Sequence, residues 1–244
     1  TDQLEVVKVG SQDQPVLAKP GDDRRIDWGY LYVAAPKQAG ARSLILPEGT
    51  ARDVFAAGGE YPMVKMAMPV AASEAPVAAV VLDAVKVGAT PVSRWLLVAY
   101  DDLYSIQYMR QNLRPYWRRN GWEAADLLRA AANEYEALQQ RCLAFDEELM
   151  ADLAKAGGEN YAKLAALAYR QCFAAGKFVA DDNGQPISFC KENHSNGCIG
   201  TSDVFYPMAP QFLLLGPSLA KSFLVPFMNY AASDRWKFPF APHD

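Results

Sequence analysis

The most constraining feature of the sequence is a long helical pattern interrupted by two adjacent glycines. From about residue 122 to residue 156, apolar residues recur every three or four positions, which predicts one helix with a single apolar face. Gly157 and Gly158 end this helix, and residues 160–177 repeat the spacing over a wider apolar arc. Two helices joined by so short a turn are expected to pack as an antiparallel αα-hairpin.

The first 98 residues show a different pattern, that of short β-strands. Segments rich in β-branched and aromatic residues alternate with glycine, proline and aspartate, which is typical of an antiparallel, sandwich-like sheet. Strands are expected at residues 4–9, 26–33, 43–46, 77–82 and 94–100. We therefore expect an α+β protein, with a sandwich-like β region at residues 1–98 and a helical-hairpin region at residues 99–244.

Two elements are predicted on either side of the helical pair. Asp101 or Asp102 can cap a helix over residues 103–113, which Pro115 then stops. Residues 182–184, with the sequence Asp-Asn-Gly, predict the tight turn of a short β-hairpin.

The C-terminal part is expected to hold a polar loop followed by one helix. Residues 185–210 combine many polar side chains with glycines and prolines, a composition typical of loops that present functional groups. Pro217 suits the first position of the last helix, and Pro226 is expected to kink it.

Charge and hydropathy argue against two classes of partner. The 24 basic and 28 acidic residues are well mixed and give a net charge of −4, so nucleic acid and anionic membranes are not expected partners. No apolar run approaches the roughly 18 residues of a membrane span, and no signal-peptide pattern opens the chain. Because the sequence begins at Thr1 and stops after Asp244 without a recognisable end, further N- and C-terminal sequence of the same polypeptide is expected.

Four cysteines allow three disulfide pairings. Cys142 and Cys172 lie equally far from Gly157, so the helical hairpin would bring them together, and Cys190 and Cys198 could close the polar loop. Two such bridges would suit an exported protein. The alternative is four reduced cysteines that serve as small apolar residues, whereas the spacing does not favour a metal site.

The polar loop also carries the strongest candidates for catalysis. Hydrolysis without a metal needs an activated nucleophile or two carboxyl groups in different protonation states. Glu192 and Asp203 lie eleven positions apart across a glycine-rich bend, so a fold-back would bring them face to face, and Asp244 is a third candidate. Equally open is a structural role, in which Glu192 pairs with a neighbouring basic residue and Asp203 caps a turn.

Other constellations in the sequence rank below the two carboxylates. The Ser-x-x-Lys pattern of some amidohydrolases occurs at Ser188 and at Ser218, about as often as chance allows. A Ser195, His243 and Asp203 triad is conceivable. The acidic run at residues 181–183 lacks the other ligands of a calcium loop and is better explained as a turn.

Several motifs, in order from about residue 20 to the end, resemble those of the fungal-type glutaminase A family. The most specific are the Lys-Glu-x-x-Ser-Asn-Gly pattern of residues 191–197 and the Asp-Val-x-Tyr-Pro pattern of residues 203–207. The matching segments are Ile26–Tyr32, Tyr100–Tyr108, Tyr116–Gly121, Leu167–Gln171, Phe189–Gly197, Thr201–Pro207 and Phe240–Asp244.

This resemblance implies a fold, an activity and a location. It implies a β-sandwich region followed by helical hairpins that form part of an (α/α)6 barrel, as in six-hairpin glycosidases. The implied activity is hydrolysis of the side-chain amide of L-glutamine to L-glutamate and ammonia, without a metal or other cofactor. The protein would be secreted, periplasmic or on the cell surface, and the isolated chain need not be active.

The resemblance also suggests roles for individual residues. Glu192 and Asp203 are expected to be the catalytic acid and base. Lys191, Asn193 and Asn196 are expected to contact the substrate or its oxyanion, and His243 and Asp244 are expected on the opposite wall of the site. Arg170 would clamp a carboxylate of the substrate or, alternatively, pair with Asp101 or Asp102.

Two rival functions stay open at the level of sequence. A glycoside hydrolase could use the same scaffold, because fold does not fix substrate, and the aromatic residues near the loop would suit sugar stacking: Phe189, Phe205, Tyr206 and Trp236. A binding module without catalysis is the other rival, in which the polar loop only holds structure.

Overall fold

The structure is a computed structural model that describes residues 2–19, 26–58, 61, 71, 73, 75–174, 176–192 and 197–244. Contacts divide the chain into two compact units. The first comprises residues 1–14, 27–102 and 123–133, and the second comprises residues 15–26, 103–122 and 134–244. The domain boundary predicted at residue 98 stays a prediction.

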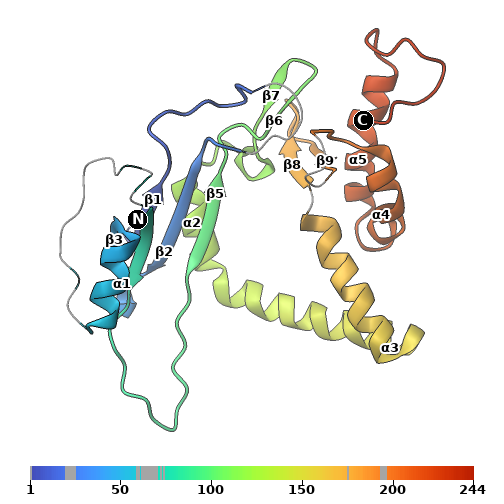
Figure 1. Ribbon diagram of the computed structural model, residues 1–244. Helices are drawn as coiled ribbons and strands as arrows, with labels where there is room; N and C mark the ends of the chain where they lie inside the picture. Colours follow the sequence, from blue (N-terminus) through green and yellow to red (C-terminus); the bar gives the residue numbers. More distant parts are fainter. Residues whose placement is uncertain are drawn as a thin grey trace. The chain divides into compact units, whose positions relative to one another are not determined.

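Unit 1 is built around two antiparallel sheets (Figure 1). A three-stranded sheet has the order β1-β2-β5, with Leu4 opposite Pro36 and Tyr30 opposite Asp101, and β3 and β4 form a two-stranded sheet. The bounds are β1 Leu4–Val9, β2 Tyr30–Pro36, β3 Arg42–Pro47, β4 Pro76–Val81 and β5 Leu97–Asp101. All five predicted strands are therefore confirmed within a few residues, except that β2 starts later than expected.

The two sheets of unit 1 also contact each other. β1 contacts β3, and β2 contacts β4, which is compatible with a sandwich, although the sandwich itself stays a prediction. Helix α1 (Glu48–Ala56) follows β3, and helix α2 (Ala124–Asn133) packs against β5. Leu128 of α2 joins Leu4 and Ala34 in the buried core of this unit.

Unit 2 begins its helical part with the long helix α3, Tyr135–Ala174. Gly158 has φ 83° and ψ 174°, a conformation that essentially only glycine adopts, so the helix breaks there into two arms. Figure 1 shows the arms diverging from this point. The arms are still in contact well away from the turn, since the ring centroids of Phe145 and Tyr169 lie 5.7 Å apart. The break predicted at Gly157 and Gly158 is confirmed. The single helix predicted over residues 122–156 is wrong, because a turn at Glu134 divides it into α2 and the first arm of α3.

The helix predicted over residues 103–113 is wrong, because this segment is a β-hairpin. Strands β6 (Ile106–Tyr108) and β7 (Gln111–Leu113) pair in antiparallel fashion. Met109 and Arg110 connect them with φ 51° and 70°. Two consecutive residues with positive φ make the tight turn whose twist matches paired strands, and a right-handed helix excludes it.

A second hairpin leads into the predicted polar loop. Strands β8 (Gly176–Ala180) and β9 (Pro186–Cys190) pair in antiparallel fashion, and the Asp181 carboxylate accepts the backbone N–H groups of Asn183 (2.9 Å) and Gln185 (2.8 Å). Gly184 supplies the positive φ of 75°. The predicted turn is thus confirmed.

The prediction of one loop over residues 185–210 is wrong at both ends. Its start belongs to β9, and its end is the first part of helix α4, Ser202–Leu215. Pro207 and Pro210 lie inside α4, although each removes a helical hydrogen bond. The helix is held by its buried face, because Phe205, Met208 and Phe212 follow the three-to-four spacing of a core stripe.

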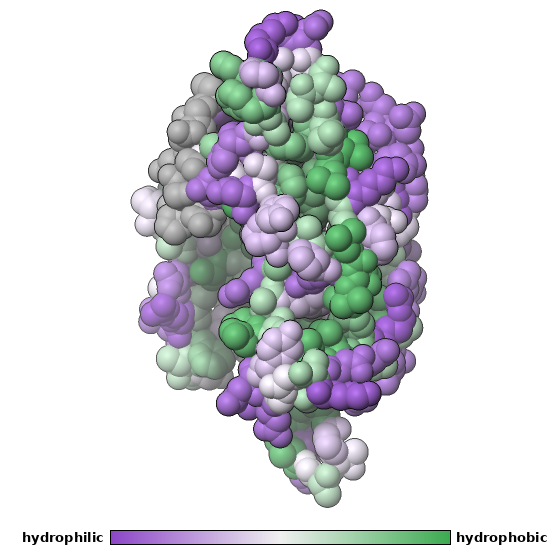
Figure 2. All heavy atoms as spheres, turned by 90° about the vertical axis from the view of Figure 1, so that its right-hand side faces the viewer, coloured by the Kyte–Doolittle hydropathy of each residue, from purple (hydrophilic) through white to green (hydrophobic). Residues whose placement is uncertain are grey.

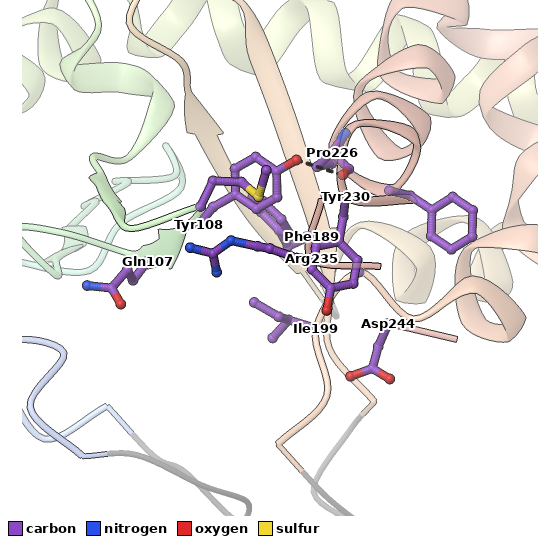
Figure 3. Close-up of a pocket in the computed structure, with 11 residues that line it drawn as sticks. Gln107, Tyr108, Phe189, Ile199, Pro226, Tyr230, Arg235 and Asp244 are labelled. Carbon is purple, nitrogen blue, oxygen red and sulfur yellow. Dashed lines mark hydrogen bonds between the residues drawn. The ribbon is translucent and has the colours of Figure 1, made fainter. Parts of the chain in front are cut away.

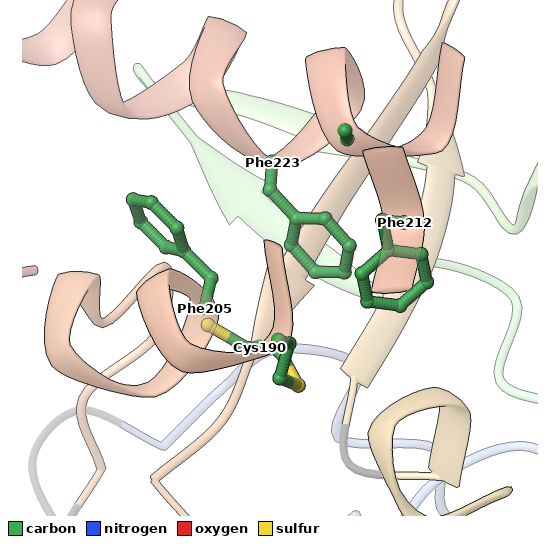
Figure 4. Packing of buried hydrophobic residues seen from close by; sticks show 6 residues of the cluster. Cys190, Phe205, Phe212 and Phe223 are labelled. Carbon is green, nitrogen blue, oxygen red and sulfur yellow. The ribbon is translucent and has the colours of Figure 1, made fainter. Parts of the chain in front are cut away.

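The last helix, α5 (Pro217–Ala231), begins at Pro217 as predicted and continues through Pro226. It packs against both α4 and β9. Figure 4 shows the resulting cluster, in which the rings of Phe205, Phe212 and Phe223 lie to one side of Cys190 at the end of β9. This core fixes the start of α4 against the end of β9, the two points from which Asp203 and Glu192 project.

The two predicted disulfides are wrong, because all four cysteines are thiols in the structure. Cys190 is buried and its sulfhydryl donates to the Thr201 carbonyl oxygen (3.3 Å). Its backbone pairs with Gly200 and not with Cys198, so the bend has the wrong register for a bridge. On α3, Cys142 is exposed beside the groove between the arms, whereas Cys172 packs against the α4–α5 cluster.

Large apolar side chains are exposed on the outer faces of α4 and α5. Figure 2 looks onto the side of the molecule that carries these helices and shows several hydrophobic patches between hydrophilic ones. The exposed residues there include Tyr206, Leu213, Leu214, Leu215, Leu224 and Met228. Among the described residues, no helix combines the length and hydropathy needed to cross a bilayer.

Candidate functional site: a carboxylate–histidine cluster

The bend after β9 is closed by antiparallel backbone pairing. Three rungs join its two sides: the Gly200 N–H donates to the Cys190 carbonyl (2.8 Å), the Glu192 N–H donates to the Cys198 carbonyl (3.3 Å), and Lys191 pairs with Ile199. The chain therefore folds back as the sequence predicts. Glu192 is half-buried at the open end of this short ladder.

Helix α4 positions the second carboxylate. Thr201, which is fully buried, precedes the helix, and Asp203 lies in the first turn, where the helix dipole favours a negative charge. The Ser202 N–H donates to the His243 carbonyl oxygen (2.7 Å). This bond ties the C-terminal segment to the start of α4 and sets the His243 ring beside Asp203.

Glu192, Asp203 and His243 form one cluster. One polar side-chain atom of each residue lies within 4.8 Å of the others. Nε2 of His243 lies 3.3 Å from Oδ1 of Asp203, and Nδ1 lies 3.1 Å from Oδ1 of Asp244. Both ring nitrogens thus face a carboxylate oxygen. Only the doubly protonated imidazolium can donate to both at once.

The pKa of His243 reflects these contacts. The hydrogen bond with Asp244 raises the pKa above its usual value, and the negative charges of Asp203 and Asp244 raise it further. More than half of the His243 side chain is exposed (53%), so water screens these charges. The cluster is consequently solvent-accessible and combines acidic side chains with one imidazole.

The same side chains are the residues that could hold a metal ion. The set of Glu192, Asp203 and His243 offers two carboxylates and an imidazole, and Cys198, His243 and Asp244 have polar atoms within the same 4.8 Å limit. Such donors are acceptable to a divalent cation. The contacts between His243 and the two aspartates already account for this geometry, and the expected absence of a metal stays a prediction.

The structure distributes the other predicted site residues unevenly. Lys191 is half-buried in the ladder beside Glu192. Arg170 is exposed on α3, in the groove that also contains Asp146, and is not part of the cluster. Asn193 and Asn196 lie outside the described residues. The catalytic and substrate-binding roles suggested by the resemblance all stay predictions.

The serines of the alternative catalytic sites are not part of the carboxylate–histidine cluster in the described part of the chain. Ser188 is 6% exposed, and its hydroxyl shares a 2.8 Å hydrogen bond with the hydroxyl of Ser222. The Ser188 hydroxyl is therefore already engaged with another buried side chain. Ser218 is exposed on α5, and Ser195 lies outside the described residues.

A cavity of about 170 Å³ adjoins the cluster and was missed at the level of sequence (Figure 3). Asp244 lines the cavity and also contacts His243 of the cluster. Ile199 and Gly200, at the edge of the bend after β9, line the cavity as well. The remaining walls come from the β6–β7 hairpin, β9, α5 and the segment after it: Gln107, Tyr108, Met109, Phe189, Pro226, Phe227, Tyr230 and Arg235. The part of this wall that the β6–β7 hairpin supplies could not be predicted, because the hairpin was expected to be a helix.

Two family models match the chain. The model described as domain of unknown function (DUF5127) matches residues 1–152, and the glutaminase A six helical-hairpin domain matches residues 158–244. No solved structure matches the chain significantly.

Two curated proteins are similar to the chain. Glutaminase A from Aspergillus oryzae is 25% identical over 97% of the chain and 35% of its own length. A protein named probable glutaminase/05536, from Arthroderma benhamiae, is 26% identical over 54% of the chain and 15% of its own length. The chain thus spans about a third or less of the length of these relatives.

The fold and the matches together define the class of protein. It is an α+β chain in which a DUF5127 region precedes part of a six helical-hairpin domain. The chain belongs to the glutaminase A-like family.

Proposed function

We propose that this protein contributes to a glutaminase, which hydrolyses L-glutamine to L-glutamate and ammonia. The observation that supports the proposal most is the proximity of Glu192, Asp203 and His243, whose polar atoms lie within 4.8 Å of one another. Membership of a family with relatives named as glutaminases supports the choice of substrate.

In the proposed mechanism the two carboxyl groups act on one water molecule and one amide. Asp203, which receives a hydrogen bond from His243 and lies at a helix N-terminus, removes a proton from the water as its oxygen attacks the amide carbon. The carbon–nitrogen bond of the tetrahedral intermediate then breaks, and Glu192 donates its proton to the leaving ammonia. Transfer of the proton from Asp203 to Glu192 restores the starting state.

His243 would act on Asp203 without touching the substrate. As an imidazolium it holds Asp203 on one side and is itself held by Asp244 on the other (3.3 and 3.1 Å). Lys191, beside Glu192 in the ladder, is proposed to stabilise the oxyanion of the intermediate, and Asn193 and Asn196 would be further contacts.

The proposal also covers where the protein is located and which further parts of the polypeptide cover it. The family resemblance supports a protein outside the cytoplasm. The exposed apolar residues of α4 and α5 support coverage by other parts of the same polypeptide, and the chain spans only 35% of the A. oryzae relative.

The test is ammonia release from L-glutamine, measured for the protein and for Glu192→Gln and Asp203→Asn. Removing either general acid–base group is expected to lower kcat by about 10²–10⁴-fold. Matched control variants, Glu147→Gln and Asp152→Asn, change exposed acids of α3 and should keep full activity. Undiminished turnover in the two site variants would refute the proposal.

The glycosidase alternative makes a different prediction, which is sugar release from aryl glycosides. It has less support, because Phe189 and Phe205, two of the aromatic residues that could stack on a sugar, are only 3% and 7% exposed. Ammonia release with no sugar release is the expected outcome.

A further inference from the structure

His243 belongs to both sets of potential metal ligands in the described part of the chain. One set adds Glu192 and Asp203, and the other adds Cys198 and Asp244. A neutral imidazole has one nitrogen with a free lone pair, so it can bind one metal ion and donates a hydrogen bond through its other nitrogen. His243 can therefore serve only one of the two sets at a time.

The contacts of the His243 ring suit a metal ligand. Nδ1 lies 3.1 Å from Oδ1 of Asp244, and Nε2 lies 3.3 Å from Oδ1 of Asp203. A histidine that binds a metal almost always donates its other ring N–H to a carboxylate, a backbone carbonyl or water, and this outer partner orients the ring. With a metal ion on Nδ1, the Nε2–H group keeps Asp203 as its acceptor. The ring is thus oriented for an ion on its Asp244 side.

The donor types favour the set with Cys198 and Asp244. Zn²⁺ binds thiolate, imidazole and carboxylate ligands, whereas Mg²⁺ and Ca²⁺ prefer oxygen alone. The Asp244 side chain is also less exposed than that of Asp203, 40% against 68%, so water screens its charge less. The set with Asp203 offers two carboxylates and no sulfur, which makes it the weaker zinc site of the two.

The separations within the Cys198 set are close to those around one zinc ion. Zn²⁺ binds sulfur at about 2.3 Å and nitrogen or oxygen at about 2.0–2.2 Å, so tetrahedral ligand atoms lie about 3.3–3.8 Å apart. Nδ1 of His243 lies 3.1 Å from Oδ1 of Asp244, and all three ligand atoms lie within 4.8 Å of one another. The largest shift required is therefore about 1 Å, which side-chain rotation can supply.

Backbone hydrogen bonds fix the two segments that carry these ligands. In the bend after β9, the Cys198 carbonyl accepts the Glu192 N–H (3.3 Å). In the C-terminal segment, the His243 carbonyl accepts the Ser202 N–H (2.7 Å), and Pro242 is buried. An ion shared by the two segments would cross-link them beside the start of α4.

We propose that Cys198, His243 and Asp244 bind Zn²⁺, with Nδ1 of His243 as the nitrogen ligand and Asp203 as the acceptor of its Nε2–H group. The thiol proton and the Nδ1 proton are released to solvent as the ion binds. The inference goes beyond the proposed function and does not require it, because zinc takes the place of the Nδ1 proton while Asp203 keeps its hydrogen-bond donor. The sequence did not favour this site, because its ligands lie on segments that only the fold brings together.

The experiment measures Zn²⁺ binding by calorimetry on the full chain, after treatment with a chelator and in the presence of a reductant. One ion is expected to bind per chain, and Mg²⁺ should not compete with it. Cys198→Ser and Asp244→Asn should each weaken Zn²⁺ binding by more than about 100-fold, and Asp203→Asn by about 10–100-fold, as for the outer partner of a ligand. Glu192→Gln removes only a nearby charge and should weaken binding by less than about tenfold.

Co²⁺ provides a readout that does not depend on any variant, because a thiolate bound to cobalt gives a charge-transfer absorption band. The unaltered chain should show this band, and Cys198→Ser should lose it. Matched controls are Cys142→Ser and Asp152→Asn, which change exposed residues of α3 and should keep both the band and the affinity. Absence of the band, absence of saturable Zn²⁺ binding, or stronger weakening by Glu192→Gln than by Cys198→Ser would overturn the inference.

Discussion

The hydrogen bond between Ser188 and Ser222 gives a prediction whose size can be worked out from the structure. Ser188 is on β9, which leads to Glu192, and Ser222 is on α5, which leads to Arg235. The hydroxyls lie 2.8 Å apart and are 6% and 1% exposed. Ser222 also lies 2.6 Å from the Leu219 carbonyl. Its single proton is donated to that carbonyl, so the Ser188 hydroxyl donates to Ser222.

The two serines should therefore respond differently to alanine. Ser222→Ala leaves the Ser188 hydroxyl buried without its partner, at a cost of about 1–3 kcal/mol in the free energy of unfolding. Ser188→Ala leaves the bond from Ser222 to Leu219 intact and should cost about 0.5–1.5 kcal/mol. The double variant removes both hydroxyls and should be no less stable than Ser222→Ala.

Urea denaturation of the four proteins measures the coupling between the two serines. Ser218→Ala is the matched control, because this serine is exposed on the same helix, and it should change stability by less than about 0.5 kcal/mol. Strictly additive effects of Ser188→Ala and Ser222→Ala would refute the reasoning, since they would mean that neither hydroxyl depends on the other.

Three further predictions follow from other parts of unit 2. The pKa of His243 is raised, so the stabilising contribution of its imidazolium is complete below about pH 6.5 and is lost as the pH rises through the folded-state pKa; an NMR titration of its ring protons should have its midpoint above 6.5, and a lower midpoint would contradict the described contacts. Gly158→Ala places a side chain at φ 83° and ψ 174° and should cost about 1–3 kcal/mol, measured by thermal unfolding, whereas an unchanged Tm would mean that the hairpin turns differently. Native protein should react with a thiol reagent at the exposed Cys142 but not at Cys190, where burial raises the pKa to about 11; equal labelling in mass spectrometry, or a disulfide between them, would be inconsistent with this fold.

Local patterns explain which elements were predicted correctly. The apolar faces of α2 and α3 repeat along the sequence, and the break at Gly158 is a property of glycine itself, so both could be recognised without tertiary information. The turn before β9 is equally local, because the Asp181 side chain accepts backbone N–H groups within four residues.

The errors arose where tertiary contacts decided between two readings. Ile106, Tyr108 and Leu113 fit a helical face as well as a strand, and the turn that makes them a hairpin depends on positive φ at Met109 and Arg110, residue types that rarely adopt it. In α4, prolines suggested a loop, whereas burial of one face in the aromatic cluster maintained a helix.

The candidate site was likewise predictable only in part from the sequence. The fold-back that brings Glu192 toward Asp203 could be anticipated from the glycine-rich bend. His243 was expected on the opposite wall of the site, whereas in the structure its ring lies beside Asp203. The disulfide between Cys190 and Cys198 could not be judged from symmetric spacing, because the register of the ladder decides it. Arg235 carried no recognisable motif, since its place beside the cavity depends on the packing of α5.

The most direct test of the central claim is a double-variant cycle on the rate of ammonia release from L-glutamine. If Glu192 and Asp203 act together on one substrate, the variant with both Glu192→Gln and Asp203→Asn should be nearly as active as the worse single variant, because residues that work as a unit are strongly non-additive. Independent, multiplicative losses, or activity that survives both substitutions, would contradict the account.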